Sequence, residues 1–397
     1  MLEVFLGGYL FHPAALDYSG DTCRNGCAYC FANINKEERR GNLTGAINAI
    51  HKKEPVTYRD LLVKMGYPIC VSNRSDPFTP RNARDTVALF THLAQIPNGI
   101  FIQTKTGHGM DEAFEALEGK KNVAMYITIT TLRDVVARLI EPGAPSPTER
   151  LRIAKAFHDA GYLTIVAMNP LSEAWMPRED LETMAGTLKA CGINHVCLEM
   201  LDIKRKRLSL LADNRKARLG DAVHTLGDAN RAYVREATQY FIREGFTVAK
   251  KGMPNRSDFF SDLQNTLGLT MPVLQDFVNH CFDRYGDAGG VVGYDEFEAV
   301  MARGPVFDGT LKQNNIRDYL LRSGFVSWKE NKQVHSHREL LKIVWNDPRH
   351  RISIQNHCLY RVIGKNDRPA VDENGNVRLL FSTTPYLSRK KGVICHV

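Results

Sequence analysis

Three cysteines lie close together near the N-terminus, in the segment Cys23-Arg-Asn-Gly-Cys27-Ala-Tyr-Cys30. This C-x3-C-x2-C spacing, on a loop that contains glycine, allows three thiolates to bind one inorganic core. A structural zinc ion or an electron-transfer cluster usually has four protein ligands. Three thiolates on a 4Fe–4S cluster leave one iron open for chemistry, so we expect Cys23, Cys27 and Cys30 to be metal ligands and catalytic residues. A zinc site completed by a distant ligand, or three unrelated loop cysteines, are the alternatives.

Short apolar runs alternate with amphipathic stretches after this loop. This alternation predicts parallel strands joined by right-handed crossovers. With about six such units, we expect an α/β fold, a partial (β/α)6 TIM-type barrel whose ligands bind at the carboxyl ends of the strands. The expected strands are residues 68–73, 100–105, 123–130, 163–168 and 195–200, and the clearest helices are residues 85–94, 148–160 and 178–191.

The pattern of apolar and polar residues in the second half of the chain predicts mainly helices rather than further strand–helix units. A helix at 231–244 and a strand at 245–250 would close the barrel, which places the barrel core at residues 1–250 and a substrate-handling region at 251–397. That region is expected to be mostly helical, ending in a small β region. Its expected elements are helices at 258–266, 271–285, 294–303 and 315–323, and a hairpin within 351–381 that turns at 372–375.

Polar residues follow the predicted strands at the edge where a barrel binds its ligands. Because five strand ends carry such residues in register, we expect one shared site rather than five separate caps. They are Ser75 and Asp76, then Lys105, then Thr128 and Thr130, then Asn169, and finally Glu199.

The cysteine loop, with Tyr29 just before the third cysteine, resembles the signature of the radical S-adenosylmethionine (SAM) superfamily. Ser75-Asp-Pro-Phe-Thr-Pro80 resembles an element of spore photoproduct lyase and its DNA-repair relatives, and the stretch from Thr130 to Leu151 is similar to theirs. The resemblance covers residues 17–200. It implies that SAM binds the open iron and is cleaved reductively to a 5′-deoxyadenosyl radical.

The resemblance also implies roles for individual residues. Cys23, Cys27 and Cys30 would hold the 4Fe–4S cluster, and Lys105 would bind the carboxylate of SAM. Tyr29 and Phe31 would flank the cofactor. The remaining predicted cofactor-binding residues are Ser75, Asp76, Thr128, Thr130 and Asn169.

One position departs from the family. Spore photoproduct lyase has a cysteine just before its Ser-Asp element, which returns a hydrogen atom to the product. Here that position is Asn73, and Cys70 lies three residues earlier, near the start of its strand. Since an amide is a poor hydrogen-atom donor, dimer reversal by the same route is in doubt.

The charge and composition of the chain indicate what it could bind and where it would be located. Lys and Arg outnumber Asp and Glu by 52 to 44, and 13 basic residues against six acidic ones fall between Asp202 and Arg256. Such a stretch could track a phosphate backbone, or it could form solvated helix faces. Nine cysteines, no 18-residue apolar run and no leader-like N-terminus predict a cytoplasmic protein without a disulfide framework or membrane span.

We therefore expect a radical SAM enzyme of the lyase or isomerase type. Its expected substrate is a nucleobase in DNA, for repair or for rearrangement of a thymine-derived base. The resemblance implies an electron donor such as flavodoxin or ferredoxin. RNA, a peptide or a small molecule as substrate, and an iron–sulfur redox sensor that never cleaves SAM, are the alternatives.

Overall fold

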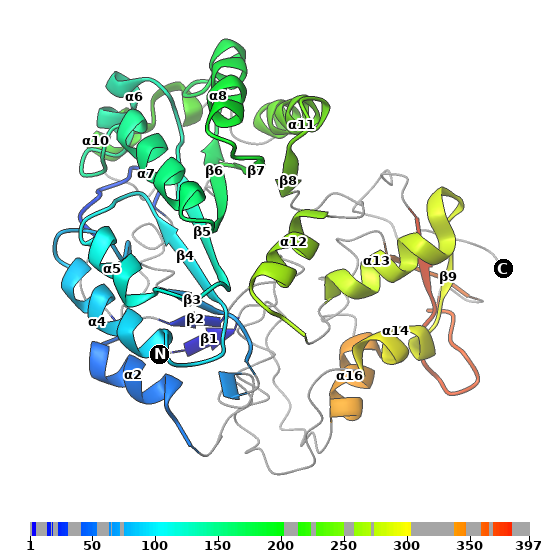
Figure 1. The fold of residues 1–397 in the computed structure, drawn as a ribbon. Helices are drawn as coiled ribbons and strands as arrows, with labels where there is room; N and C mark the ends of the chain where they lie inside the picture. The colour runs from blue at the N-terminus through cyan, green and yellow to red at the C-terminus, as the bar shows by residue number, and fades with distance from the viewer. Residues whose placement is uncertain are drawn as a thin grey trace.

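A computed structural model describes the parts of the chain from which the fold and the site are built. Figure 1 shows a strand–helix layer beside a smaller, mainly helical region. The described residues are 2–4, 14–16, 18, 23–30, 41–53, 63–64, 66–71, 75–201, 213–223, 228–249, 258–270, 274–302, 337–346, 359–364 and 368–382.

An eight-stranded sheet organises the first 250 residues. Its strands follow one another in space in the order of the chain. The first pair is antiparallel, and every later pair is parallel. Sequential parallel order is the arrangement of a partial α/β barrel, so the predicted fold class is confirmed. The strands are β1 (Leu2–Val4), β2 (Ala14–Leu16), β3 (Ile69–Val71), β4 (Ile100–Thr104), β5 (Val123–Thr128), β6 (Leu163–Leu171), β7 (His195–Met200) and β8 (Thr247–Ala249).

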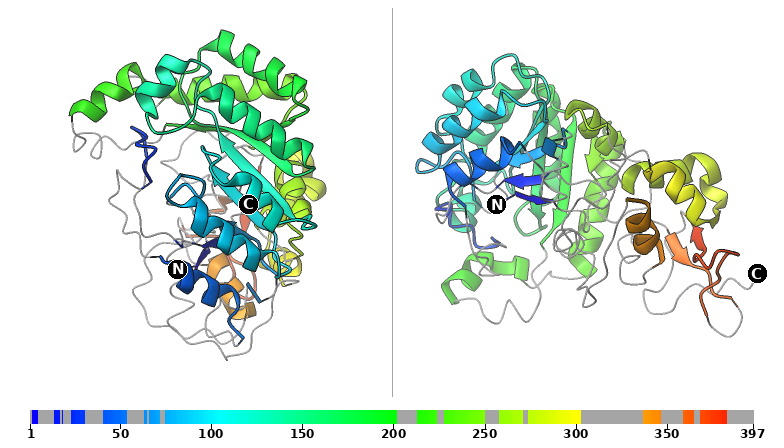
Figure 2. Two further views of the ribbon diagram at one scale, coloured as in Figure 1. Left: turned by 60° about the vertical axis from the view of Figure 1, so that its left-hand side comes forward. Right: turned by 90° about the horizontal axis from the view of Figure 1, so that it is seen from below.

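Helices cover the outer face of this sheet, and the three clearest predicted ones are observed within two residues of their expected bounds (Figures 1 and 2). The helices of this part are α2 (Leu43–Ile50), α4 (Ala83–Leu93), α5 (Met110–Ala116), α6 (Asp134–Ile140), α7 (Pro147–Asp159), α8 (Arg178–Ala190), α10 (Asp213–Leu219) and α11 (Asp228–Arg243).

Helix α7 shows how the sequence sets such bounds. Ser146 caps its start by accepting a hydrogen bond from the Glu149 backbone N–H at 3.2 Å, and Pro147 takes the first helical position. Gly161 then adopts a φ of +83°, a left-handed conformation that ends the helical path at little cost.

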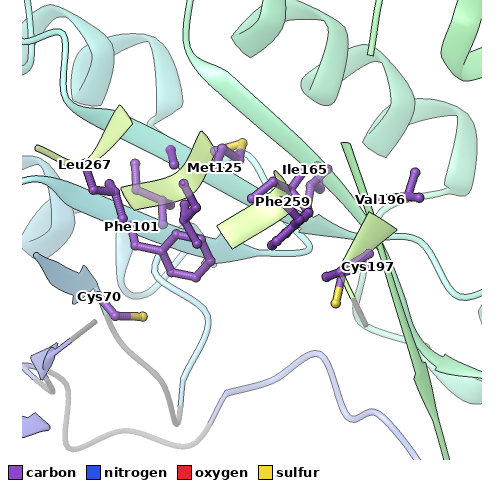
Figure 3. Packing of buried hydrophobic residues seen from close by; sticks show 14 of the residues in the cluster. Cys70, Phe101, Met125, Ile165, Val196, Cys197, Phe259 and Leu267 are labelled. Carbon is purple, nitrogen blue, oxygen red and sulfur yellow. The ribbon is translucent and has the colours of Figure 1, made fainter. Parts of the chain in front are cut away.

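Helix α12 (Asp258–Thr266) contacts β5 and β8, and its Asp262 lies 2.9 Å from Nε2 of His195, the first residue of β7, so the helix lies at the amino-terminal ends of the barrel strands. Phe259 and Leu267 belong to the main apolar core together with residues of β4 to β7 (Figure 3). Gly99, just before β4, approaches so closely that a Cβ there would lie 2.2 Å from the Leu267 carbonyl oxygen. Because this end is filled by side chains, a ligand has to approach from the carboxyl ends of the strands.

The rest of the described chain forms a small helical region on a three-stranded sheet of order β10–β11–β9. Trp345 is fully buried at its centre and donates a hydrogen bond from Nε1 to the Val377 carbonyl at 2.8 Å. The elements are α13 (Leu274–Tyr285), α14 (Tyr294–Met301), α16 (His337–Asn346), β9 (Gly290–Val292), β10 (Leu359–Arg361) and β11 (Leu379–Phe381).

Most of the elements predicted for this region are observed. Helices at 258–266, 271–285 and 294–303 are confirmed with ends shifted by at most three residues, and the hairpin is the β10–β11 pair. The third strand, β9, was not predicted, and the helix expected at 315–323 lies outside the described residues. No helix in the described ranges is long and apolar enough to cross a membrane. The boundary at residue 250 stays a prediction.

Candidate active site

The cysteine loop follows β2 and consists of tight turns over residues 23–30. Cys27 is buried, while Cys23 and Cys30 are half-buried. The loop is joined to the end of α6 and the segment after it by two backbone hydrogen bonds, from Ala28 N to Ile140 O at 2.8 Å and from Gly143 N to Asn25 O at 3.0 Å. A Cβ on Gly143 would lie 2.3 Å from the Arg24 carbonyl oxygen, so only glycine allows this approach.

Asp76 connects the cysteine loop to the end of β4. Its carboxylate is buried and accepts five hydrogen bonds at 2.7–3.0 Å from protein donors. A carboxylate with this many donors is held rigidly and in turn holds the chain segments that donate to it. The donors are Asn25 Nδ2, the backbone N–H groups of Phe78 and Lys105, and the hydroxyls of Thr104 and Thr106.

Lys105 therefore leaves the end of β4 with its backbone anchored to Asp76. Its ammonium lies 5.6 Å from the centre of the Tyr29 ring, in the range of a cation–π contact. Burial lowers the pKa of Lys105, but the charges of Cys27 and Glu141 outweigh burial and raise it overall. The lysine is thus a permanent positive charge beside the cysteine loop, as expected for a group that binds a carboxylate.

Tyr29 sits between this lysine and a buried ion pair. Its hydroxyl donates to Glu141 Oε1, and its ring lies 5.8 Å from the ring of Trp175. Glu141 Oε2 pairs with Arg150 Nη1 at 2.6 Å, and both side chains are at most 1% exposed. Burial and the Glu141 charge raise the pKa of Tyr29 well above its ordinary value, which keeps the phenol protonated.

The ends of β5 and the segment after it contribute hydroxyl groups. Thr128 is buried, and its carbonyl accepts a hydrogen bond from Arg150 Nη1 at 3.1 Å. Thr130 is fully buried, and its hydroxyl has no hydrogen-bond partner within the described chain. A buried hydroxyl without a partner is costly, and a ligand that hydrogen-bonds to it would remove that cost. Ser75, by contrast, accepts a hydrogen bond from Asn82 at 2.9 Å.

A second polar group lies on the neighbouring strands β5, β6 and β7. Asn169 donates from Nδ2 to the Tyr126 hydroxyl at 3.1 Å and to Glu199 Oε2 at 3.3 Å. Tyr126 donates to Cys197 Sγ at 3.5 Å, and burial together with the Cys197 charge raises the pKa of this tyrosine. Asn169 is thus held by two neighbouring strands, and its place in the cofactor shell stays a prediction.

The donor set suits an iron–sulfur cluster, since thiolates are the ligands that such clusters take. Burial, followed by the Asp76 charge, raises the pKa of Cys23, and burial raises the pKa of Cys27 to about 12. Binding of iron has to displace these protons. The described residues contain no group of three His, Cys, Asp or Glu side chains already gathered around a metal position, so ligation by the three cysteines stays a prediction. Phe31 and Asn73 lie outside the described residues.

Two aromatic residues in or near the basic stretch between Asp202 and Arg256 are core residues. Tyr233 is buried and its hydroxyl donates to the Met176 carbonyl, and Phe259 is buried at the amino-terminal end of the barrel. Two arginines of the basic stretch also have partners inside the protein. Arg218 donates to the carbonyls of Gly26 at 2.6 Å and Leu139 at 2.8 Å, and Arg215 donates to the Cys27 carbonyl at 3.5 Å.

Four residues of the site were not predicted individually, namely Glu141, Arg150, Trp175 and Arg218. Glu141 and Arg150 lie in the Thr130–Leu151 stretch, so the family resemblance marked their segment without giving them a role. A carboxylate and a guanidinium nine positions apart could have been recognised as a buried pair only from the fold. Trp175 and Arg218 carry no local signal.

Parts of the chain are similar to known proteins. Residues 18–185 match the radical SAM superfamily. An uncharacterized protein of Acidianus two-tailed virus is 25% identical over 195 residues, which cover 45% of this chain and 64% of that protein. The match thus spans less than two thirds of this relative's length.

Solved structures of spore photoproduct lyase are also similar. One, complexed with dinucleoside spore photoproduct, has a TM-score of 0.43 and 15% identity, covering 58% of this chain and 73% of that one. A mutant with bound SAM and dinucleoside spore photoproduct has a TM-score of 0.41 and 14% identity, covering 55% of this chain and 70% of that one.

Proposed function

Since residues 18–185 of this chain belong to the radical SAM superfamily, we propose that the protein is an enzyme that starts a radical reaction from SAM at a cluster on Cys23, Cys27 and Cys30. The observation that carries the proposal is the position of Lys105. Its ammonium lies over Tyr29, beside the cysteine loop and at the carboxyl end of β4. A redox sensor that never binds SAM has no need of a fixed cation there.

The bound cluster would supply the electron that cleaves SAM to a 5′-deoxyadenosyl radical. The protein's residues would bind SAM and orient it. Lys105 would attract the carboxylate of SAM, and the unpartnered hydroxyl of Thr130 would hydrogen-bond to its ribose or amino-acid part. Tyr29, held by its hydrogen bond to Glu141, would pack its ring against the cofactor. Asp76 is a positioning residue, because it holds the Lys105 backbone and the loop residue Asn25.

For the substrate we propose a nucleobase in DNA, in a lyase or isomerase type of reaction on a thymine-derived base. The support is the resemblance of Ser75–Pro80 and Thr130–Leu151 to the spore photoproduct lyase branch. A base carries C–H bonds that acid–base side chains cannot activate. A radical can activate them by abstracting the hydrogen atom. A base in a duplex would have to leave the stack to reach the carboxyl ends of the strands. We place the enzyme in the cytoplasm, with a small electron carrier as reductant.

Cleavage of SAM is tested under anaerobic conditions. The protein is reconstituted with iron and sulfide, reduced with dithionite and mixed with SAM, and 5′-deoxyadenosine is measured by chromatography. We expect product from the wild type and from Cys191→Ala, whose half-buried thiol follows α8, and little or none from Cys27→Ala, because one cluster ligand is lost. A wild-type protein with a full iron load that forms no 5′-deoxyadenosine would contradict the proposal.

The substrate is tested by isotope transfer. DNA with deuterated thymine or modified thymine is added to the same reaction, and the 5′-deoxyadenosine is analysed by mass spectrometry. Deuterium in the nucleoside identifies the base as the source of the abstracted hydrogen. Product formation without deuterium from any labelled DNA would leave the radical chemistry intact and exclude thymine carbons as its target.

A further inference from the structure

Helix α10 packs against α6 beside the cysteine loop, although it lies far from the loop along the chain (Figure 1). Residues three or four positions apart share one face of a helix. On the face of α10 toward the loop, Leu219 is fully buried and shares a small apolar cluster with Ala28 of the loop and Ile140 of α6. Arg215 and Arg218 lie on the same face and are half-buried. The burial of this face therefore holds both arginines against the loop.

The guanidinium groups of these arginines donate hydrogen bonds to backbone carbonyls. Arg218 donates from Nη2 to the Gly26 carbonyl at 2.6 Å and from Nε to the Leu139 carbonyl at 2.8 Å. Arg215 donates from Nη2 to the Cys27 carbonyl at 3.5 Å. Because Cys27 is one of the predicted cluster ligands, both positive charges are fixed beside the place where a cluster would bind.

Capping of α6 explains only part of this arrangement. Leu139 and Ile140 are the last two residues of α6, and the carbonyl end of a helix carries a partial negative charge. Arg218 reaches both carbonyls, at 2.8 Å and 3.3 Å, and so compensates that charge. Capping accounts neither for the bond from Arg218 to Gly26 nor for the contact of Arg215 with the loop.

The side chains around the loop carry an excess of positive charge. In the described part of the chain, the charged groups that hydrogen-bond to the loop, lie over its Tyr29 ring or pair with such a group are four basic and two acidic ones. Without α10 the two signs would be equal in number, so its arginines supply this excess. The basic residues are Lys105, Arg150, Arg215 and Arg218, and the acidic ones are Asp76 and Glu141.

We propose that Arg215 and Arg218 raise the reduction potential of the 4Fe–4S cluster on the cysteine loop. The inference rests on the proposed function, because only a bound cluster gives these charges something to act on. A cluster on three thiolates is negatively charged, and its reduction adds one electron from an external one-electron reductant without moving an atom. A fixed positive charge nearby stabilises the reduced form more than the oxidised form. The net charge and hydrogen bonding around a cluster are among the factors that set its potential.

The test is a redox titration of the reconstituted protein without SAM, in which dithionite lowers the potential and EPR spectroscopy measures the reduced cluster. Arg218→Met removes the charge and keeps an apolar stem. We expect the ratio of reduced to oxidised cluster at a fixed potential to fall about tenfold, which corresponds to about 59 mV for a one-electron couple. Arg218→Lys keeps the charge and should retain most of the wild-type ratio. Lys216→Met removes a charge from the same helix, where it pairs with Asp213 at 3.3 Å, and should leave the ratio unchanged.

Arg215→Met provides a second variant with a smaller structural effect. The 3.5 Å contact of Arg215 is at the long limit of a hydrogen bond, so its loss should disturb the loop less than the loss of the Arg218 bonds. Its charge is the same, and we expect the ratio of reduced to oxidised cluster to fall in the same direction. This variant carries the test if Arg218→Met does not hold a cluster. Thermal unfolding before reconstitution shows whether either substitution destabilises the protein.

Unchanged potentials in both methionine variants overturn the inference. So does an equal fall in Arg218→Lys, which would make the guanidinium a support of the loop, or an equal fall in Lys216→Met, which would make the effect nonspecific. Formation of 5′-deoxyadenosine tests the proposed function separately. A cluster whose potential depends on the arginines but that cleaves no SAM overturns that function alone. A reconstituted wild type without a 4Fe–4S signal overturns both.

Discussion

Asp76 shows how much of this site depends on one buried side chain. Its carboxylate accepts hydrogen bonds from five donors that belong to three separate segments, the cysteine loop, the Ser75–Pro80 element and the end of β4. Without an acceptor, each buried donor loses its partner and keeps its desolvation cost. The carboxylate thus holds together the segments that carry the predicted cluster ligands and Lys105.

We expect Asp76→Ala to lower the free energy of unfolding by about 3 kcal/mol or more, because several buried donors lose their acceptor. Urea unfolding followed by circular dichroism measures this change. Glu118→Ala, at an exposed turn after α5, removes a carboxylate of the same charge and should change the free energy of unfolding by less than about 0.5 kcal/mol. Equal effects of the two substitutions would show that the Asp76 hydrogen bonds contribute nothing specific.

At the residue scale the sequence predicted which residues gather but not what they contact. Asp76 and Lys105 were expected at the same rim because both follow strands, and the structure joins them by a hydrogen bond at 2.7 Å. The motif could not show that the Asp76 carboxylate binds protein donors. Thr104 and Thr106 lie 28 and 30 residues away, and their hydroxyls meet it only when β3 and β4 pair.

At the scale of elements, the segment from Ile140 to Arg150 supports the cysteine loop through backbone hydrogen bonds. The Glu141–Arg150 pair is buried at its base, and Arg150 also donates to the Pro145 carbonyl at 2.9 Å and the Thr128 carbonyl at 3.1 Å. Family resemblance marked this segment, but a carboxylate and a guanidinium nine positions apart are indistinguishable in sequence from solvated surface charges. In the structure α7 packs against β5, and both side chains of the pair are buried.

Arg150→Met should lower the free energy of unfolding by about 3–5 kcal/mol, because it leaves Glu141 as a buried charge without its partner. Arg152→Met removes the arginine of an exposed pair with Glu149 on the same helix and should have no measurable effect. Both are measured by urea unfolding. If adding Glu141→Gln to Arg150→Met restores none of the lost stability, the cost comes from packing and the unpaired charge is not its cause.

At the scale of the molecule, the alternation of apolar runs was enough to predict the order of the barrel strands. Strands buried on both faces leave continuous apolar segments such as Ile165 to Met168, which are fully buried here. The same kind of pattern predicted helix α12 at its observed bounds but not its location. An apolar helix face indicates burial without indicating against what. Helix α12 closes the amino-terminal end of the barrel, and its Phe259 packs with buried residues of β4 to β7 (Figure 3).

Gly99 provides the test of this closure. We expect Gly99→Ala to lower the free energy of unfolding by about 1–3 kcal/mol, because its Cβ would lie 2.2 Å from the Leu267 carbonyl and either α12 or β4 has to shift. Gly186→Ala, on the exposed side of α8 with no atom within 4 Å of the new Cβ, should instead stabilise by about 0.5–1 kcal/mol. Hydrogen exchange resolved by segment reports where the strain is released. Faster exchange in residues 258–270 of Gly99→Ala would show that α12 is held by this contact, whereas wild-type exchange and stability would mean that the barrel end is closed in another way.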